Sequence, residues 1–322
     1  MHEPRLADVI AARARIAPYL RPTAFRAYPA LAEALGADVW VKHENHNPTG
    51  AFKVRGGINL VSQLTPEERE RGLVTASTGN HGQSIAYAAR LHGVRATICV
   101  PEGANPVKVA AIRAMGAEIV AHGADFDEAR EHCEGLAARD GLRYVHSGNE
   151  PHLIAGVATA TLEMLEDVPD IDVIVVPIGG GSGAAGACIA AKAIRPEIEV
   201  IGAQSSAAPA AHSSWQKQKL VTGEMTTFAE GLATRTAFEL PQHILWRLLD
   251  DFVLVSDDDL RAATARMIAA TSSLVEPAGA AALAGALALR ERLAGRRVAL
   301  VASGGNISLG QLRGLLDGID AG

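Results

Sequence analysis

The feature that most constrains the fold is the alternation of short apolar, β-branched segments with longer segments of helical periodicity along almost the whole chain. Strands that alternate with helices pair in parallel, with helices on both faces of the sheet. The expected strands, bounded by Gly, Pro or polar turn residues, are 38–42, 73–76, 96–100, 118–121, 173–176, 199–203, 252–255 and 298–302. The expected helices are 52–64, 81–91, 106–115, 126–139, 153–165, 183–193, 258–270 and 277–293. The sequence therefore predicts an α/β chain built on open parallel sheets.

The length of 322 residues corresponds to about two domains. No low-complexity linker or repeat of solenoid period divides the chain, so a second domain would be inserted or tightly packed. The formal charge is −6, from 36 acidic and 30 basic residues, and no extended basic block is present. These features argue against a nucleic-acid partner.

The sequence also carries information about location. The longest apolar run, 278–289, is alanine-rich and too short to cross a bilayer, so no membrane association is expected. The three cysteines, Cys99, Cys133 and Cys188, lack CxxC spacing and are expected to be buried thiols in a reducing compartment. Because no signal peptide is visible at the N-terminus, a cytoplasmic location is expected.

The strongest local signal is a glycine loop at 179–183, with the sequence GGGSG, between an apolar strand and an alanine-rich helix. Glycines let backbone N–H groups close around an anion, and the start of the helix adds the positive end of its dipole. The loop predicts a bound phosphate, and the alternative is a tight turn without a ligand. The segment 181–186 also fits the GxGxxG dinucleotide pattern. The next strand, however, ends without the carboxylate that would hold a ribose, which disfavours NAD.

The second signal is the segment 48–57, PTGAFKVRGG, in which a Pro-Thr-Gly turn places Lys53 in the first turn of a helix. There the helix dipole and partial burial both disfavour the charged form of the amine. A neutral amine is what a lysine needs to form an imine. The alternative is a solvated surface lysine, which is the more common outcome for this residue type when the segment is taken alone.

The third signal is Ser77-Thr78-Gly79-Asn80-His81, which follows an apolar strand and begins a helix. Hydroxyls and N–H groups that converge at a helix N-terminus form a receptor for a carboxylate. The alternative is an N-cap in which Ser77 or Thr78 satisfies the first amides of the helix, and both can hold at once. His81 has no second ligand at i+3 or i+4, so a capping or packing role is favoured over a metal ligand or a general base.

The last signal is the turn 303–306, SGGN, which follows the final apolar strand. The Ser303 hydroxyl can make one hydrogen bond to a flat heteroaromatic ligand, and the glycines let that ligand approach. Taken alone, this would be an ordinary turn. Together, an amine suited to an imine, a phosphate cradle, a carboxylate receptor and a lone hydroxyl describe the binding of pyridoxal phosphate.

In order and spacing these motifs resemble those of the fold-type II pyridoxal-phosphate enzymes, in particular the threonine/serine dehydratase and serine racemase branch. The resemblance rests on the segments 48–57, 77–82, 179–183, 276–279 and 303–306. It implies pyridoxal 5′-phosphate as the cofactor, bound between two open parallel-sheet, three-layer domains. The implied domains are a large cofactor-binding domain, 1–46 and 149–322, and a small mobile substrate domain, 47–148. A homodimer is implied as well.

The resemblance also implies roles for individual residues. Lys53 would be the catalytic Schiff-base lysine and Phe52 would lie along the cofactor ring. Asn80 would bond the phenolic oxygen and Ser303 would meet the pyridine nitrogen. The implied phosphate cradle is Gly179, Gly180, Gly181, Ser182 and Gly183. The implied receptor for the substrate carboxylate is Ser77, Thr78, Gly79 and His81.

The implied activity is that of an ammonia-lyase (dehydratase), which converts an L-β-hydroxy amino acid of the threonine or serine type to a 2-keto acid and ammonia by α,β-elimination of water. A serine at position 303 does not hold the pyridine nitrogen protonated, and the weaker electron sink suits elimination over transamination. The side-chain pocket is expected to be lined partly by the segment 227–234. The segment 204–210 lacks the acidic residues that relatives use for a divalent cation, so no metal site is expected.

Other activities stay open at this point. Within the family they are an amino-acid racemase, or a dehydratase for a larger substrate such as phenylserine, 3-hydroxyaspartate or a hydroxyectoine-derived amino acid. Thr78 stands where serine racemases carry a second acid/base serine, which disfavours racemisation. Outside the family they are a binding protein without turnover, which Lys53 argues against, and a NAD-dependent oxidoreductase, which the absent ribose carboxylate argues against.

Overall fold

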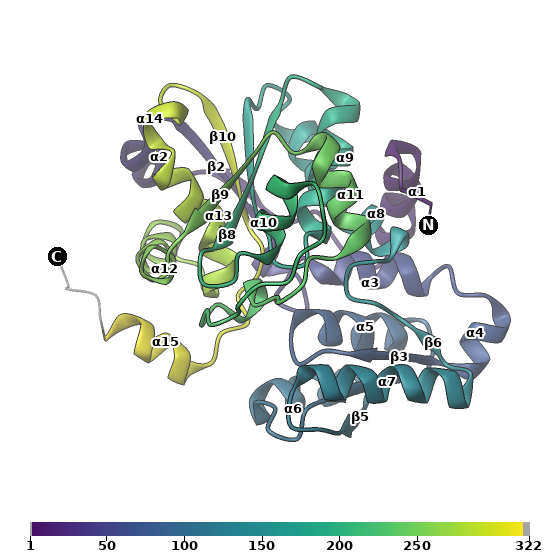
Figure 1. Cartoon of the computed structure of the whole chain (residues 1–322). Coiled ribbons are helices and arrows are strands. Elements are labelled where there is room, and N and C mark those ends of the chain that lie inside the picture. The colour runs from purple at the N-terminus through teal and green to yellow at the C-terminus, as the bar shows by residue number, and fades with distance from the viewer. Residues whose placement is uncertain (1, 318–322) are drawn as a thin grey trace.

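The computed structural model describes residues 2–317 and places them around two separate sheets (Figure 1). The six-stranded sheet has the order β1-β2-β10-β7-β8-β9, and the four-stranded sheet has the order β5-β4-β3-β6. The strands of the larger sheet are β1 (Phe25–Ala27), β2 (Asp38–His43), β7 (Val173–Pro177), β8 (Glu199–Ser205), β9 (Asp251–Val255) and β10 (Arg297–Ala302). The strands of the smaller sheet are β3 (Leu73–Ala76), β4 (Ala96–Val100), β5 (Glu118–Ala121) and β6 (Arg143–Tyr144).

The predicted parallel α/β architecture is confirmed, with one exception at an edge. Every strand pair is parallel except β1 with β2, which is antiparallel and pairs Phe25 with Lys42. The sequence did not predict β1 or β6, which have three and two residues. Strands this short carry no readable alternation, because a period of two needs about four residues to be recognised.

The larger sheet is buried on both faces, which explains the continuous apolar runs of its central strands. Val173 and Val175 of β7 pack into one hydrophobic cluster with α12 and α13, whereas Ile174 and Val176 pack into another with α8 and α9. The helices on the first side are α2 (Pro29–Leu35), α12 (Asp257–Thr271), α13 (Pro277–Ala288) and α14 (Arg290–Leu293). The helices on the second side include α8 (Pro151–Asp167), α9 (Ser182–Ile194), α10 (Ala210–Lys217) and α11 (Glu239–Leu248).

The smaller sheet repeats this plan on a smaller scale. Its strands pack on one side against α5 (Asn80–Leu91) and α6 (Pro106–Ala114), and on the other against α7 (Phe126–Asp140). Cys99 and Cys133 lie in the cluster on the α7 side. They and Cys188 are buried free thiols, as predicted.

One helix, α3 (Lys53–Val61), lies between the two sheet units (Figure 1). A Cβ atom on Gly56 would come within 2.9 Å of the Leu153 carbonyl oxygen in α8, and one on Gly57 within 2.3 Å of Ser84 Oγ in α5. Glycine at both positions therefore lets α3 pack closely on both neighbours. The strands of the smaller sheet all fall within 47–148. That this segment is a mobile domain stays a prediction.

Several helices were not predicted from periodicity. These are α1 (Leu6–Ile16), α2, α4 (Pro66–Arg71), α10, α11 and α15 (Leu309–Leu316). The predicted helix 277–293 is wrong in its extent, because α13 ends at Ala288 and α14 begins only at Arg290. Across residues 2–317, no helix combines the length and the apolar character that a membrane span requires.

Candidate active site

The site forms where loops at the carboxyl ends of parallel strands meet between the two sheets, as expected for open α/β sheets. The segment 77–80 follows β3, the loop 178–181 follows β7 and the turn 303–306 follows β10. α3 begins directly at Lys53. The motifs singled out in the sequence therefore converge, although up to 250 residues separate them, counted from Lys53 to Ser303.

Lys53 faces the glycine loop. Its Nζ atom lies 2.9 Å from Ser182 Oγ and 3.1 Å from the Ser147 carbonyl oxygen, and it donates to both. Burial lowers the pKa of Lys53 to about 8, because an ammonium group loses hydration in this position. The side chain is thus partly buried and hydrogen-bonded, and the alternative of a solvated surface lysine does not describe it.

The glycine loop presents unpaired donors at the start of α9. Gly181 is the residue before the helix and has φ +89°, a left-handed conformation that favours glycine. Within the part of the chain that the structure describes, the backbone N–H groups of residues 179–184 donate to no protein acceptor. A Cβ atom on Gly179 would lie 2.4 Å from the Gly231 carbonyl oxygen, so the loop tolerates no side chain there. Free donors around a helix N-terminus fit a phosphate group.

The turn after β10 is bonded to the turn that precedes Lys53. Phe52 N–H donates to the Ser303 carbonyl at 3.0 Å, and Gly305 N–H donates to the Gly50 carbonyl at 2.9 Å. The Ser303 hydroxyl is 3.5 Å from its nearest protein acceptor, the Ala278 carbonyl, which leaves it available for a stronger partner. Phe52, Gly183 and Ser303 line one small cavity of about 20 Å³, so the three residues lie around a common space.

Asn80 is held in a fixed orientation by two side chains. Its Nδ2 donates to Glu276 Oε1 at 2.7 Å, and its Oδ1 accepts from Asn306 Nδ2 at 2.7 Å. The amide group carries a second hydrogen on Nδ2, which fits a ligand oxygen acceptor such as a phenolate. Burial raises the pKa of Glu276 to about 7, although the bond from Asn80 acts in the opposite direction.

In the segment after β3 the structure shows the N-cap, and the carboxylate receptor stays a prediction. Ser77 Oγ accepts from the N–H groups of Gly79 at 3.2 Å and Gly82 at 3.0 Å, so Ser77 does cap the start of α5. Among residues 2–317, no protein acceptor is found for the N–H groups of Thr78, Asn80 and His81. These three N–H groups form the receptor that a carboxylate would need.

The His81 ring is buried, and it forms its hydrogen bond with Thr75 and not with a group of this receptor. Thr75 Oγ1 donates its proton to the Val145 carbonyl at 2.7 Å, so the 3.0 Å contact between Thr75 Oγ1 and His81 Nε2 requires a proton on Nε2. Burial, with Lys53 and His146 nearby, lowers the pKa of His81 to about 3. The ring is therefore neutral and packed, and its backbone N–H is the group that faces the receptor.

Four residues near the site had no role assigned from the sequence. Glu276 and Asn306 lie in the segments 276–279 and 303–306 on which the resemblance rests. Only their contacts with Asn80 show that they orient its amide group. Lys108 forms an ion pair with Glu230, and both line a second cavity of about 30 Å³ beside Glu276. The predicted lining segment 227–234 contributes to this cavity. Long-range pairs of this kind leave no local signal in a sequence.

The part of the chain that the structure covers holds no cluster of three or more metal-ligating side chains. The hydrogen-bond donors that line the site are backbone N–H groups, hydroxyls, one amide and one amine. This set matches a phosphorylated, flat, carbonyl-bearing ligand together with a carboxylate, which is the combination that pyridoxal phosphate and an amino acid present.

Comparison with known proteins agrees with this donor set. A family model described as "Pyridoxal-phosphate dependent enzyme" matches residues 16–304. An L-threonine ammonia-lyase of Thermotoga maritima is 35% identical over 308 residues, which cover 95% of this chain and 77% of the relative. The solved structure of the processed form of threonine deaminase isoform 2 from Solanum lycopersicum has a TM-score of 0.94 at 30% identity, covering 98% of this chain and 92% of that one.

A solved maize serine racemase has a TM-score of 0.92 at 31% identity and covers 98% of each chain. The fold type and the threonine/serine dehydratase branch that the motifs suggested are thereby confirmed. The NAD-dependent and non-catalytic alternatives find no support among these relatives. The chain therefore belongs to the pyridoxal-phosphate dependent enzyme family, and its cofactor is pyridoxal 5′-phosphate.

Proposed function

We propose that the protein is an ammonia-lyase that converts a β-hydroxy amino acid of the threonine or serine type to a 2-keto acid and ammonia. The observation that carries the proposal is the arrangement around Lys53. An amine with a pKa near 8 lies 2.9 Å from Ser182 of the phosphate cradle. The similarity to an L-threonine ammonia-lyase over 95% of this chain supports the same chemistry.

The proposed roles are those that the resemblance implies, and the contacts of each residue support them. Lys53 would bind the cofactor covalently, the loop 179–183 would hold its phosphate, and Phe52 would lie against its ring. The Nδ2 hydrogen of Asn80 that Glu276 does not accept would bond the phenolic oxygen, and the weakly bonded Ser303 hydroxyl would bond the pyridine nitrogen. Pyridoxal phosphate, when bound, supplies the electron sink that makes the substrate Cα proton acidic and allows the β-hydroxyl to leave.

The chain's own residues supply binding, orientation and proton transfer. The free N–H groups of Thr78, Asn80 and His81 hold the substrate carboxylate and so orient Cα toward Lys53. Nζ of Lys53 takes the Cα proton, and its lowered pKa provides the neutral amine that a general base requires. Ser182 Oγ and the Ser147 carbonyl keep Nζ in place, because both accept from it.

A racemase is the second candidate, and the similarity to a solved serine racemase at 31% identity favours it. The two activities share Lys53 as the base on one side of Cα. Racemisation needs a second acid on the opposite side, and the residue available in this segment is Thr78. A secondary hydroxyl at that position supports elimination over racemisation.

The test is a panel of purified holoenzyme assays that follow both products. Ammonia and 2-keto acid release is measured with L-threonine, L-serine, 3-hydroxyaspartate, phenylserine and their stereoisomers. Release that is lost in Lys53→Ala supports the lyase, and the ranking of substrates defines the side-chain class. Loss of optical rotation without ammonia release would instead establish a racemase, and ammonia release that survives Lys53→Ala would refute the assignment of the base.

The assembly and location remain part of the proposal. We infer a homodimer in the cytoplasm from the resemblance. Two apolar side chains, Val107 and Leu309, are 63% and 84% exposed, and a subunit contact would cover such side chains. Sedimentation of the purified protein at several concentrations decides between a monomer and a dimer.

A further inference from the structure

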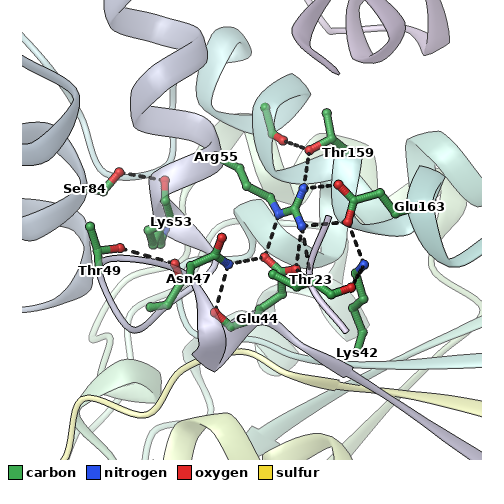
Figure 2. A network of polar contacts seen from close by, with 12 residues as sticks. Thr23, Lys42, Glu44, Asn47, Thr49, Lys53, Arg55, Ser84, Thr159 and Glu163 are labelled. Atoms are coloured by element: carbon green, nitrogen blue, oxygen red, sulfur yellow. Dashed lines mark hydrogen bonds and ion pairs between the residues drawn. The ribbon is translucent and has the colours of Figure 1, made fainter. Parts of the chain in front are cut away.

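A buried cluster of charged side chains lies behind the turn that carries Lys53 (Figure 2). Arg55 is 1% exposed, and its guanidinium donates to two carboxylates. Nε and Nη2 lie 2.7 and 2.8 Å from the Glu44 oxygens, and Nη1 and Nη2 lie 2.6 and 2.8 Å from the Glu163 oxygens. Lys42 Nζ lies 2.6 Å from Glu163 Oε2. We call these four residues the Arg55 cluster.

The cluster is balanced in charge, with two cations and two carboxylates, and Arg55 is the member that bonds both carboxylates. Burial raises the pKa of Glu44 and is the largest single effect. The charge and hydrogen bonds of Arg55, with smaller contributions from Lys42 and Thr23, together outweigh burial, so the net shift is downward. Burial lowers the pKa of Arg55, but Glu44 and Glu163 outweigh it, so the net shift is upward. Buried charges stay ionised only while their partners remain in contact. The cluster therefore fixes the relative positions of the elements that it joins.

Those elements come from both sheet units. Arg55 belongs to α3, whereas Lys42 lies in β2, Glu44 in the short helix η1 (Glu44–His46) and Glu163 in α8. The backbones of α3 and α8 also touch, since a Cβ atom on Gly156 would lie 2.6 Å from the Arg55 carbonyl oxygen. The first turn of α3 is thus attached to the larger sheet unit, although it precedes the smaller sheet in the chain.

Lys53 and Arg55 share this turn and point to different sides of it. Residues two apart on a helix are separated by about 200° around its axis. Arg55 points into the cluster, and Lys53 points toward Ser182 of the phosphate cradle at 2.9 Å. The turn is also held from the smaller unit, because Ser84 Oγ donates to the Lys53 carbonyl at 2.6 Å.

We propose that Arg55 is a positioning residue for the Lys53 amine. The Arg55 cluster fastens the first turn of α3 to the side of the site that carries the phosphate cradle, so that the amine keeps its distance from that cradle. Arginine suits this task because its planar fork bonds two carboxylates at once, which a lysine ammonium does not do in a fixed geometry. This inference rests on the proposed function, in which Lys53 binds the cofactor.

The test compares Arg55→Lys, which keeps the charge and loses the fork, with Lys42→Met as the matched control. Lys42 belongs to the same buried cluster but lies on β2, and among residues 2–317 its amine donates to Glu163 and to the Thr23 carbonyl and not to α3. The first readout is the rate at which pyridoxal phosphate attaches to Lys53 of the cofactor-free protein, trapped by borohydride and located by mass spectrometry. The second is the kcat and KM of the holoenzyme, and the third is the melting temperature.

In Arg55→Lys we expect attachment and kcat to fall by about 10²-fold with little change in KM, because misplacement of a reacting group by about 1 Å has an effect of this size. In Lys42→Met we expect a lower melting temperature with attachment and kcat close to wild type. Wild-type attachment and kcat in Arg55→Lys would overturn the inference. So would equal losses in both variants at equal melting temperatures, because that result indicates a purely structural cluster.

Two further results keep the test decisive. If Arg55→Lys does not fold, Glu44→Gln replaces it, since that change keeps the side-chain shape and weakens one arm of the fork. Wild-type behaviour of a folded Glu44→Gln would then count against the inference. If the wild-type protein itself attaches no cofactor at Lys53, the proposed function fails, and this outcome is distinct from a failure of the role of Arg55.

Discussion

The Nζ atom of Lys53 lies 2.9 Å from Oγ of Ser182, which joins the start of α3 to the start of α9 across the site. Both residues stand at helix N-termini, where unpaired N–H groups and the helix dipole disfavour a positive charge. Burial is the cause of the lowered pKa of this amine, and the two helix N-termini act in the same direction. The amine is consequently easier to deprotonate than an ordinary lysine.

The first prediction concerns the titration of this amine. In the cofactor-free protein, labelling of Lys53 by an amine-reactive reagent should reach half its maximal rate near pH 8, because burial lowers the pKa of Lys53 to about 8. Peptide mass spectrometry measures the labelling, with the exposed Lys217 in the same sample as the reference amine. A half-maximal rate above pH 10 would contradict the buried position of the group.

The same shift has a consequence for stability. The folded-state pKa lies below the unfolded value of about 10.5, so the folded protein holds fewer protons than the unfolded chain between pH 8 and 10.5. The contribution of Lys53 to the free energy of unfolding is therefore fully present above pH 10.5 and is lost as the pH falls through 8. Lys53→Met lacks this dependence, and denaturant melts across this pH window measure the difference.

The second prediction is a pH dependence of opposite sign at Glu276. Burial raises its pKa from 4.5 to about 7, so the folded protein holds a proton that the unfolded chain releases between these values. The contribution of Glu276 is fully present below pH 4.5 and is lost as the pH rises to 7, by roughly 3 kcal/mol at most. Urea melts of the wild type and of Glu276→Gln at several pH values from 5 to 8 measure it. Parallel curves for the two proteins would show that Glu276 is not buried as described.

The third prediction concerns the contact between α3 and α8. In Gly156→Ala the added Cβ would lie 2.6 Å from the Arg55 carbonyl oxygen and 2.7 Å from Gly56 Cα, and backbone atoms cannot yield easily. We expect a loss of about 1–3 kcal/mol of unfolding free energy. The matched control is Gly135→Ala in α7, where a Cβ meets nothing within 4 Å. That variant should gain about 0.5–1 kcal/mol from helix propensity. Urea midpoints that shift in the same direction in both variants would refute the close contact.

The loops of the site were easier to predict from the sequence than the buried side chains that hold them in place. The loops around Gly181, Ser77 and Ser303 consist of glycines and hydroxyl residues in local patterns, and each pattern carries its own chemistry. Arg55 and Glu163 lie 108 residues apart and meet only in the folded chain. From the sequence alone, Glu163 would be expected on the exposed face of a helix, because no neighbouring residue indicates that a buried cation lies beside it. The edge strand Phe25–Ala27 was not predicted for a related reason. Its pairing with β2, and not a pattern in its own sequence, makes it a strand.

The fourth prediction concerns the ion pair between Lys108 of α6 and Glu230 of η2 (Glu230–Leu232), which connects the smaller sheet unit to the larger one. Gln311 of α15 also donates to the Glu230 carboxylate at 2.7 Å. The Lys108 side chain is 11% exposed and that of Glu230 is 47% exposed, so salt screens the pair in part. Because both residues line the cavity beside Glu276, the pair closes one side of the site.

The resemblance implies that the smaller sheet unit closes over the substrate, and Lys108→Met should weaken that closure. A half-exposed pair contributes up to about 1 kcal/mol, which corresponds to a decrease in kcat/KM of roughly fivefold. Raising the salt concentration should lower kcat/KM of the wild-type holoenzyme and leave that of Lys108→Met unchanged, because the variant has no pair to screen. The control is Arg130→Met, which removes the exposed pair between Arg130 and Glu134 within α7 and should alter neither quantity. Equal salt dependence in the wild type and in Lys108→Met would show that the pair does not control closure.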